Sequence, residues 1–270
     1  MVEQIGSGKV PEPILPAPDF LINVDRPELF LAIVAPIGVD AVNVLGALHQ
    51  SLQSVGYETS VIKITELMKK IPTDVALVET PHDERYKSYI AYANRVRELL
   101  NIRKDKVAGN DSLAMLAVGA IMKARASYTG SETIPCKARV YILDQFKRPE
   151  EIALLRKLYG RLFIQISVHA TKATRKENLN RRIKSSHVDT NVVDYSSEAE
   201  DLIRQDLSEE DQPHGQRVRD AFPMADVIVN GNDKKNVEHD ISRFINLLFG
   251  TILLRPHTTS MACTLPRALL

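Results

Sequence analysis

Residues 29–40, "LFLAIVAPIGVD", decide the fold of this chain. The apolar run 29–35 predicts a strand buried on both faces, as in a parallel sheet covered by helices. Pro36 and Gly38 interrupt the run, and residues 41–57 then place their apolar side chains at helical spacing. A strand, a glycine-containing loop and a helix in this order predict the start of a three-layer α/β domain.

The alternation of strands and helices continues to residue 250. Strands are predicted at 59–64, 138–144, 162–168 and 225–230, and helices at 87–100, 111–127, 148–160, 171–184 and 236–250. Because these strands are apolar rather than alternating, a parallel sheet with helices on both sides is expected. We expect an extended leader at 1–27, one α/β domain at 28–250 and a separate tail at 251–270.

Composition narrows the functional classes. The chain has 270 residues, 44% of them hydrophobic, which is enough for a sizeable core. A net charge of +1 argues against nucleic acid as the main partner. Cys136 and Cys263 match no disulfide or zinc spacing, and neither a signal peptide nor a membrane span is evident. We therefore expect a cytoplasmic protein without a membrane partner.

Two oppositely charged segments stand next to each other in the second half of the chain. Residues 172–184 are strongly basic, and residues 194–211, which we also expect to be helical, are strongly acidic. Two solvent-exposed helix faces are the usual explanation of such a pattern. The alternative is a flap that binds an anion.

The loop after the first strand is the better of two candidate phosphate sites. The "GSGK" at 6–9 has no strand before it, whereas backbone amides of residues 37–41 are placed to cradle a phosphate, with Gly38 permitting close approach. The full phosphate-loop pattern is not met, because Val39 stands at the lysine position and Asp40 at the hydroxyl position. Asp40 is equally suited to cap the following helix. Phosphate binding is thus predicted without the lysine that phosphoryl transfer uses.

A second polar group precedes the last strand, in "HGQRVRDAFPMADVIVN" (214–230). On a helix, Gln216 and Asp220 would share one face. Arg217 and Arg219, near a strand end of an α/β sheet, suit phosphate recognition, although an ordinary ion-pair network explains them equally well. The candidate nucleotide-binding residues are Gly38, Asp40, Gln216, Arg217, Arg219 and Asp220.

The sequence contains only parts of the zinc-binding motifs of nucleobase deaminases. Nucleobase deaminases use H-x-E and P-C-x-x-C, and the chain offers "HDE" at 82–84 and "PCKA" at 135–138. Only His82 and Cys136 would remain as ligands, and two ligands do not make a catalytic zinc site. We expect His82 in a loop and Cys136 in the turn before a strand. No metal site, bound cofactor or catalytic residue is predicted for this chain.

Several segments together resemble a known family. "FLAIVAPIGVD", "RVYILDQFKRPEEIALLRKLYG", "LFIQISV", "HGQRVRDAFPMADVIV" and "RFINLLFG" occur in the order seen in bacterial antiphage dCTP deaminases. Those proteins join a domain similar to P-loop nucleoside-monophosphate kinases to a zinc-dependent deaminase domain. The resemblance spans residues 28–255 and implies a kinase-like fold, with 172–184 as the lid region. Ala35 stands where the family usually has glycine, and the family loop generally lacks the lysine as well.

The resemblance also implies a function. The chain would be the regulatory, nucleotide-binding domain of an enzyme that deaminates dCTP or dCMP through a zinc-bound hydroxide and so starves a phage of dCTP. Implied partners are a deoxynucleotide, further copies of the chain in a homo-oligomer, and a phage factor or regulatory RNA as trigger. Two alternatives stay open: a free-standing deoxynucleoside monophosphate kinase, and a non-catalytic module for sensing or oligomerisation.

The tail departs from the family. There, the helix like "RFINLLFG" leads into "PTxDEYGMxxAxxASLRS", which opens the deaminase domain, whereas residues 256–270 read "PHTTSMACTLPRALL". Back-translated with permitted codons and read one base earlier, they give T-H-D-E-Y-G-V-H-L-A-K-G-A-S, in which the first glycine is forced by the Met261 and Ala262 codons. We expect residues 256–270 to be an out-of-frame reading, and 251–270 as a whole to be a remnant or out-of-frame start of a missing deaminase domain that carries the zinc, so that the chain as given does not deaminate.

Overall fold

The structure of the chain, a computed structural model, describes residues 26–101, 110–187, 194–208 and 213–250. Most of the leader and the whole of the tail at 251–270 lie outside these residues. The predictions for those two segments, including the out-of-frame reading, therefore stay predictions.

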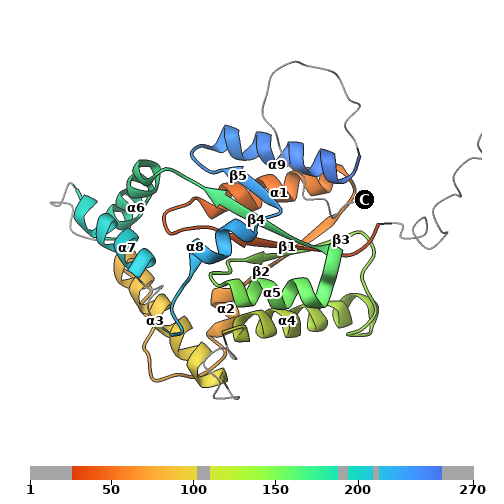
Figure 1. Ribbon diagram of the computed structural model, residues 1–270, viewed down its shortest axis with the longest axis horizontal. Helices are drawn as coiled ribbons and strands as arrows, with labels where there is room; N and C mark the ends of the chain where they lie inside the picture. Colours follow the sequence, from red (N-terminus) through yellow and green to blue (C-terminus); the bar gives the residue numbers. More distant parts are fainter. Residues whose placement is uncertain (1–25, 102–109, 188–193, 209–212, 251–270) are drawn as a thin grey trace, which may run out of the picture.

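A five-stranded parallel sheet forms the centre of the described part (Figure 1). Its strands are β1 (Leu29–Val34), β2 (Glu58–Lys63), β3 (Arg139–Asp144), β4 (Phe163–His169) and β5 (Val227–Asn230). They lie in the order β2-β3-β1-β4-β5, and every neighbouring pair is parallel. The predicted three-layer α/β fold with a parallel sheet is confirmed.

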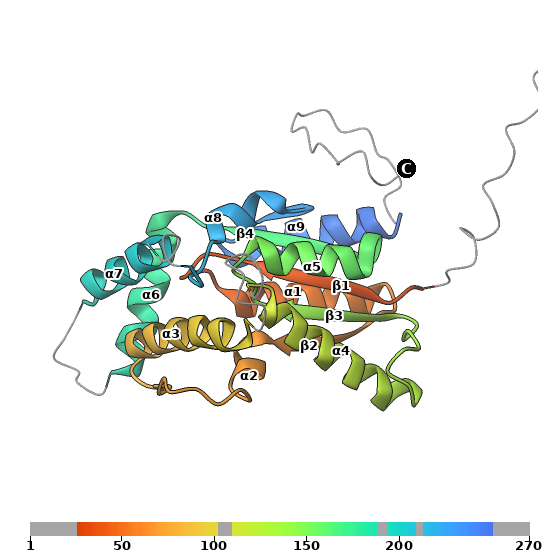
Figure 2. The ribbon, with the colours of Figure 1, turned by 60° about the horizontal axis from the view of Figure 1, so that its bottom comes forward.

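The helices of the described residues lie on both faces of the sheet and at one end of it (Figures 1 and 2). They are α1 (Ala41–Ser54), α2 (Ile64–Met68), α3 (His82–Leu100), α4 (Ser112–Thr129), α5 (Pro149–Tyr159), α6 (Lys172–Ser186), α7 (Ser196–Ser208), α8 (Val218–Ala221) and α9 (Lys234–Leu248). Short 3-10 turns at Gly160–Leu162 and Phe222–Met224 precede β4 and β5. None of these helices combines the length and apolar character needed to cross a membrane.

Strand β1 explains why both faces are covered. Successive side chains of a strand point to opposite faces. Leu31 and Ile33 therefore pack with α1 and α9, whereas Phe30, Ala32 and Val34 pack with α2, α3, α4 and α5 on the other face. All five side chains are at most 1% exposed. A seven-residue apolar run without alternation is thus accounted for by two separate cores.

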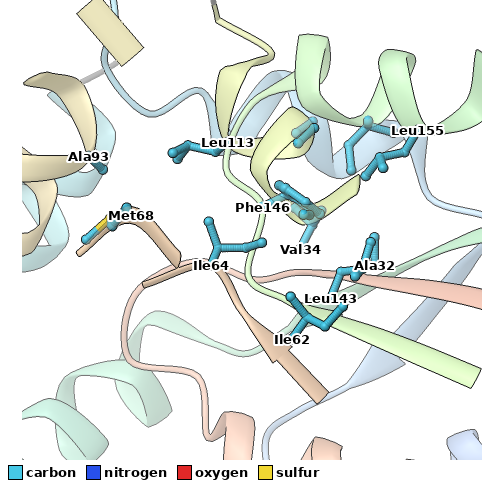
Figure 3. Packing of buried hydrophobic residues seen from close by; sticks show 14 of the residues in the cluster. Ala32, Val34, Ile62, Ile64, Met68, Ala93, Leu113, Leu143, Phe146 and Leu155 are labelled. Atoms are coloured by element: carbon cyan, nitrogen blue, oxygen red, sulfur yellow. The ribbon is translucent and has the colours of Figure 1, made fainter. Parts of the chain in front are cut away.

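The core on the α4–α5 face also anchors the loop that follows β3. Figure 3 shows Phe146 pointing into this core beside Val34, with Leu113 and Leu155 close by. The Phe146 backbone N–H donates to the carbonyl oxygen of Ile33 at 3.1 Å. The loop is therefore fixed to the end of β1 by a hydrogen bond and by a fully buried ring.

A third, smaller core lies outside the two sheet cores. It joins α6 to α7 through Leu179, Ile183, Tyr195, Ala199, Leu202 and Ile203, and it includes Ile37 of the β1–α1 loop. The predicted basic and acidic helices are confirmed as elements. They form one packed pair, called the α6–α7 pair below, at the carboxyl end of the sheet (Figure 1).

Two element predictions need correction. The helix predicted at 87–100 begins at His82, so His82 lies in the first helical turn and not in a loop. The segment 82–86 has no apolar period, but Asp83 and Glu84 suit the positive end of a helix dipole, and the His82 backbone N–H donates to Ser186 Oγ at 2.8 Å. The short helix α2 was not predicted, since five residues give too little periodicity.

Candidate functional site

The carboxyl ends of the strands bring the predicted site segments to one edge of the sheet. The β1–α1 loop (35–40), the β3–α5 loop (145–148) and the β4–α6 connection (170–171) all leave the sheet there, and the α6–α7 pair lies beside them (Figure 1). Ligands of open α/β sheets bind outside the carboxyl ends of the strands. This edge is therefore the candidate site.

Gly38 allows α6 to lie directly on the β1–α1 loop. Its φ is +88°, and a Cβ there would lie 2.7 Å from the backbone oxygen of Arg175. The contact is reinforced because Asn178 Nδ2 donates to the Gly38 carbonyl at 3.0 Å and Arg175 Nε to the Ile37 carbonyl at 2.6 Å. The close approach predicted for Gly38 is thus made by the protein's own helix.

Asp40 caps helix α1. Its carboxylate accepts hydrogen bonds from the Val42 backbone N–H at 3.2 Å and from Asn43 Nδ2 at 3.1 Å. The guanidinium of Arg182, on α6, lies 3.4 Å from the same carboxylate. The capping role is confirmed, whereas a contact of Asp40 with a nucleotide stays a prediction.

A buried carboxylate already occupies the loop. The Ile37 backbone N–H donates to Asp206 Oδ2 at 3.0 Å, and Asp206, on α7, is only 3% exposed. Two cations flank it: Arg175 Nη2 at 3.5 Å and Lys147 Nζ at 3.7 Å. Lys147 Nζ also donates to the Ala35 carbonyl at 2.7 Å. One anionic group is therefore met by a backbone N–H of the loop and by two positive charges from other elements.

The two charged helices are more than solvent-exposed faces. Lys176 and Glu200 do form an exposed pair at 2.9 Å, as the usual explanation predicts. Asp206, however, is buried, and the Arg175 side chain beside it is only 11% exposed, between the helices and the loop. Burial lowers the pKa of Arg175, and Asp206 opposes that effect. The prediction of solvated faces is right for part of the pair and wrong for the part that contacts the loop.

The second predicted segment reaches the same edge through the β3–α5 loop. The Arg217 backbone N–H donates to the Lys147 carbonyl at 2.8 Å, which places residues 214–217 beside Lys147. The Arg217 side chain pairs with Asp220 and lies 3.5 Å from Glu150, so the ion-pair interpretation describes it. Arg219 is exposed.

Gln216 differs from its prediction. Helix α8 begins only at Val218, so Gln216 precedes the helix and does not share a helical face with Asp220. Gln216 is 7% exposed, and its buried Oε1 has no hydrogen-bond partner among the described residues. The two predicted groups are linked through Lys147, whose Nζ donates to the Ala35 carbonyl of the β1–α1 loop and whose carbonyl accepts from the Arg217 backbone N–H.

A buried ion pair holds the β3–α5 loop in place. Glu151 is fully buried and accepts from Arg97 Nη2 at 2.8 Å and from the backbone N–H groups of Lys147 at 3.0 Å and Arg148 at 3.1 Å. Arg97 Nη1 reaches the His214 carbonyl at 3.3 Å. One carboxylate thus fixes the position of Lys147 and of the 214–217 segment together.

A small polar cavity adjoins the loop on the side of β5. It measures about 200 Å³ and is lined by Asp40, Asn43, Asn178, Arg181 and Lys234, among others. Arg181 hydrogen-bonds to Asn178 Oδ1, which keeps its guanidinium on the cavity wall. The cavity is smaller than the pockets that hold whole drug-sized ligands, so it suits one small polar group.

His82 and Cys136 do not come together. Cys136 is a buried free cysteine before β3, as predicted, and its backbone N–H bonds to Glu28 at the opposite end of the sheet. His82 packs edge-on against Tyr86 near α6. In the described part of the chain, no group of three or more His, Cys, Asp or Glu side chains is arranged to hold a metal ion.

Burial and the charges of Arg182 and Arg85 lower the pKa of His82 to about 4. The His82 pKa in the unfolded chain is 6.5, so below pH 6.5 the unfolded chain binds a proton at His82 that the folded chain does not bind. The free energy of unfolding therefore falls as the pH drops from 6.5 towards 4. His82→Phe keeps a ring and removes the titration. We expect it to regain on the order of 1 kcal/mol relative to the unmodified chain at low pH, after allowance for the solvent screening of a half-buried ring.

Urea denaturation between pH 4.5 and 7.5 measures this difference. His239→Phe is the control, because the His239 side chain is 72% exposed. Parallel pH curves for the unmodified chain and His82→Phe would show that His82 is not responsible.

Sequence reasoning missed the three charged groups that matter most at the loop, namely Lys147, Arg175 and Asp206. Two of them carried a signal. Asp206 follows Ala199, Leu202 and Ile203 at helical spacing, and Arg175 precedes Leu179 in the same way, so each charge stands on an apolar face. Lys147 follows a buried strand at its carboxyl end, where ligand-binding groups collect.

Comparisons with known proteins leave the family open. No protein-family model matches this sequence, and no curated protein matches it. Among solved structures, a gluconokinase from Sinorhizobium meliloti 1021 is similar to this chain. The match covers 83% of this chain and 97% of the gluconokinase chain, with 12% identity and a TM-score of 0.36. An uncharacterized protein from Eubacterium ventriosum ATCC 27560 covers 81% and 98%, with 12% identity and a TM-score of 0.42.

A shikimate kinase from Bacteroides thetaiotaomicron is similar to the same extent. It covers 82% of this chain and 98% of its own, with 11% identity and a TM-score of 0.40. At these scores the likeness carries no conclusion about function. The fold class rests on the parallel order of the five strands.

Proposed function

We propose that this chain binds a deoxynucleotide by its phosphates at the β1–α1 loop, as the non-catalytic regulatory domain of a deaminase that acts on dCTP or dCMP. The observation that carries the proposal is the convergence of Lys147, Arg175 and Arg182 on this loop from two other elements. Three cations beside a strand–loop–helix junction form a suitable environment for phosphate.

The geometry favours a nucleotide over a bare anion. The polar cavity of about 200 Å³ adjoins the loop at Asp40, so a phosphate on the loop leaves room for an attached polar group beside it. Arg181 and Lys234 offer donors there, and Asn43 offers its amide oxygen as an acceptor, whereas the Asn178 amide is engaged by Gly38 and Arg181. This donor and acceptor set suits a base more than an apolar group.

The composition of the loop supports binding without phosphoryl transfer. Val39 takes the lysine position and is 4% exposed, so the loop supplies no side-chain cation. Asp40 takes the hydroxyl position, and its carboxylate is engaged in capping α1. Lys147 and Arg175 supply charge from outside the loop, which serves recognition. The alternative of a deoxynucleoside monophosphate kinase is therefore the less supported one.

The deaminase assignment rests on the resemblance of the sequence. The zinc and the catalytic residues would belong to a following domain, and this chain would report the nucleotide pool to it. The coding DNA tests this directly: the shifted reading frame beyond residue 270 is expected to encode H-x-E and P-C-x-x-C. A frame without these motifs, or deamination of dCTP by the purified 270-residue chain, would contradict the assignment.

Thermal denaturation with the deoxynucleoside mono- and triphosphates tests the nucleotide site. A ligand that binds only the folded state stabilises it by about 2.7 kcal/mol at a hundred times its Kd, so the melting temperature is expected to rise. Arg182→Gln removes a cation 3.4 Å from Asp40 and is expected to weaken binding at least about tenfold.

Arg204→Gln is the matched control, since Arg204 is 77% exposed on α7 and pairs with Asp201. It makes the same change of charge and is expected to leave binding unchanged. No rise in melting temperature with any deoxynucleotide would refute the site. Transfer of phosphate from ATP to a deoxynucleoside monophosphate would revive the kinase alternative.

A further inference from the structure

We infer that Asp206 occupies the place of a ligand phosphate on the β1–α1 loop, so that the α6–α7 pair closes the site from within and an incoming phosphate must displace this carboxylate. The inference rests on the proposed function and names how the same site is regulated. Its ligand class is a polyphosphate, free or attached to a nucleoside.

The contacts of Asp206 are those that a phosphate oxygen would make. One oxygen accepts the Ile37 backbone N–H at 3.0 Å and lies 3.5 Å from Arg175 Nη2, and the other lies 3.7 Å from Lys147 Nζ. Backbone N–H groups between a first strand and a first helix are the donors that phosphate uses in such folds. The carboxylate therefore fills an anion position of the loop.

Packing of α7 against α6 does not by itself explain a charged residue at position 206. Ala199, Leu202 and Ile203 make the buried face of α7 apolar, and Asp206 continues that face at the next helical position. Replacing a buried ion pair by apolar side chains is often neutral or stabilising. A charge retained on this face is thus better explained by the loop it contacts than by the stability of the helix pair.

The internal contact is incompletely satisfied. Asp206 Oδ1 and Arg175 Nη2 are both buried, and neither has a hydrogen-bond partner among the described residues. A phosphate group carries more charge and more acceptor oxygens than a carboxylate, so it can engage Ile37, Arg175 and Lys147 together. Exchange of the carboxylate for a phosphate would therefore improve the hydrogen bonding of the site.

Displacement of Asp206 also acts on the helices. Asp206 is part of α7, and α7 shares a core with α6, whose Arg175 backbone contacts Gly38. A phosphate at Ile37 must therefore push α7 away from the loop and shift α6 with it. Phosphate binding is thus coupled to movement of the α6–α7 pair, and a regulatory domain can transmit such a movement to the enzyme that it controls.

Titration calorimetry of the full chain with inorganic tripolyphosphate tests the inference. Asp206→Asn keeps an acceptor for the Ile37 N–H and removes the competing charge. We expect it to bind tripolyphosphate at least about tenfold more tightly than the unmodified chain, because a full charge at about 4 Å acts strongly even in an effective dielectric of about 20. Asp201→Asn, with a 60% exposed side chain on the same helix, is expected to bind like the unmodified chain.

A second readout needs no substitution. In the unmodified chain, saturating tripolyphosphate is expected to speed hydrogen exchange in α7 while leaving that in α9 unchanged. This readout decides the matter if Asp206→Asn does not fold. Unchanged exchange in α7 on binding, or equal affinities of Asp206→Asn and the unmodified chain, overturns the inference.

The outcomes separate the two proposals. Suppose that a deoxynucleotide raises the melting temperature but Asp206→Asn binds no more tightly than the unmodified chain. The nucleotide site is then supported, and the inference that Asp206 blocks it is refuted. Suppose that Asp206→Asn binds tripolyphosphate tightly but no nucleotide changes the melting temperature. The inference about Asp206 is then supported, and the proposed nucleotide function is refuted. Absence of all binding in both chains overturns both.

Discussion

Glu151→Ala is expected to destabilise the protein by about 3–5 kcal/mol, because it leaves a buried guanidinium without its partner. The Arg97 side chain is only 2% exposed, and it donates to the Glu151 carboxylate at 2.8 Å. The same substitution also removes the acceptor of two backbone N–H groups, those of Lys147 and Arg148. An unsatisfied buried donor adds to the cost.

Urea denaturation at neutral pH measures this loss. Glu84→Ala is the matched control, since Glu84 belongs to an exposed i,i+3 pair with Lys87 and its side chain is 50% exposed. Removal of such a pair costs less than about 1 kcal/mol. If the two variants lose similar free energies of unfolding, the buried pair does not hold the loop as described.

Gly38→Ala is expected to cost at least about 2 kcal/mol, since a left-handed backbone is unfavourable for alanine and its Cβ meets the backbone of α6. The Cβ would lie 2.7 Å from the Arg175 oxygen at a φ of +88°. The substitution must therefore lift α6 from the loop or distort the loop. Either change lengthens the contacts of Ile37 with Arg175 and Asp206.

Gly46→Ala provides the opposite result on the neighbouring helix. Gly46 lies inside α1, and a Cβ there meets nothing within 4 Å. Alanine in a helix interior is expected to gain about 0.5–1 kcal/mol over glycine. Thermal denaturation of both variants checks the pair of predictions, and a stabilising Gly38→Ala would contradict the contact between α6 and the loop.

The order and type of the main elements followed from the sequence because they depend on local patterns. The apolar run 29–35 predicted burial on both faces, and Leu31 and Phe30 indeed enter different cores. Asp40 lies at a helix start, where its capping is a property of neighbours two and three residues away. Such features need no knowledge of distant residues.

The centre of the site depends on distant residues and was not predicted. Asp206 contacts Ile37 across 169 positions, and the charge pattern of α7 alone does not say which carboxylate turns inward. For Arg217 the sequence left phosphate recognition and an ion-pair network open, and the fold pairs the side chain with Asp220 and Glu150. The signal that would have revealed the missed groups is a charge placed on an apolar helix face, as in Arg175 and Asp206.

The third core, which α6 and α7 share, has a mechanical consequence. Its side chains bury their apolar surface mainly against each other, so the two helices keep that burial when they tilt as a single body. Such a tilt would disturb the polar contacts of Arg175, Asn178 and Asp206 with the loop, and also the contacts of the pair with α3, among them the hydrogen bond from the His82 backbone N–H to Ser186 Oγ. Displacement of the Asp206 carboxylate would therefore move α6 and α7 together.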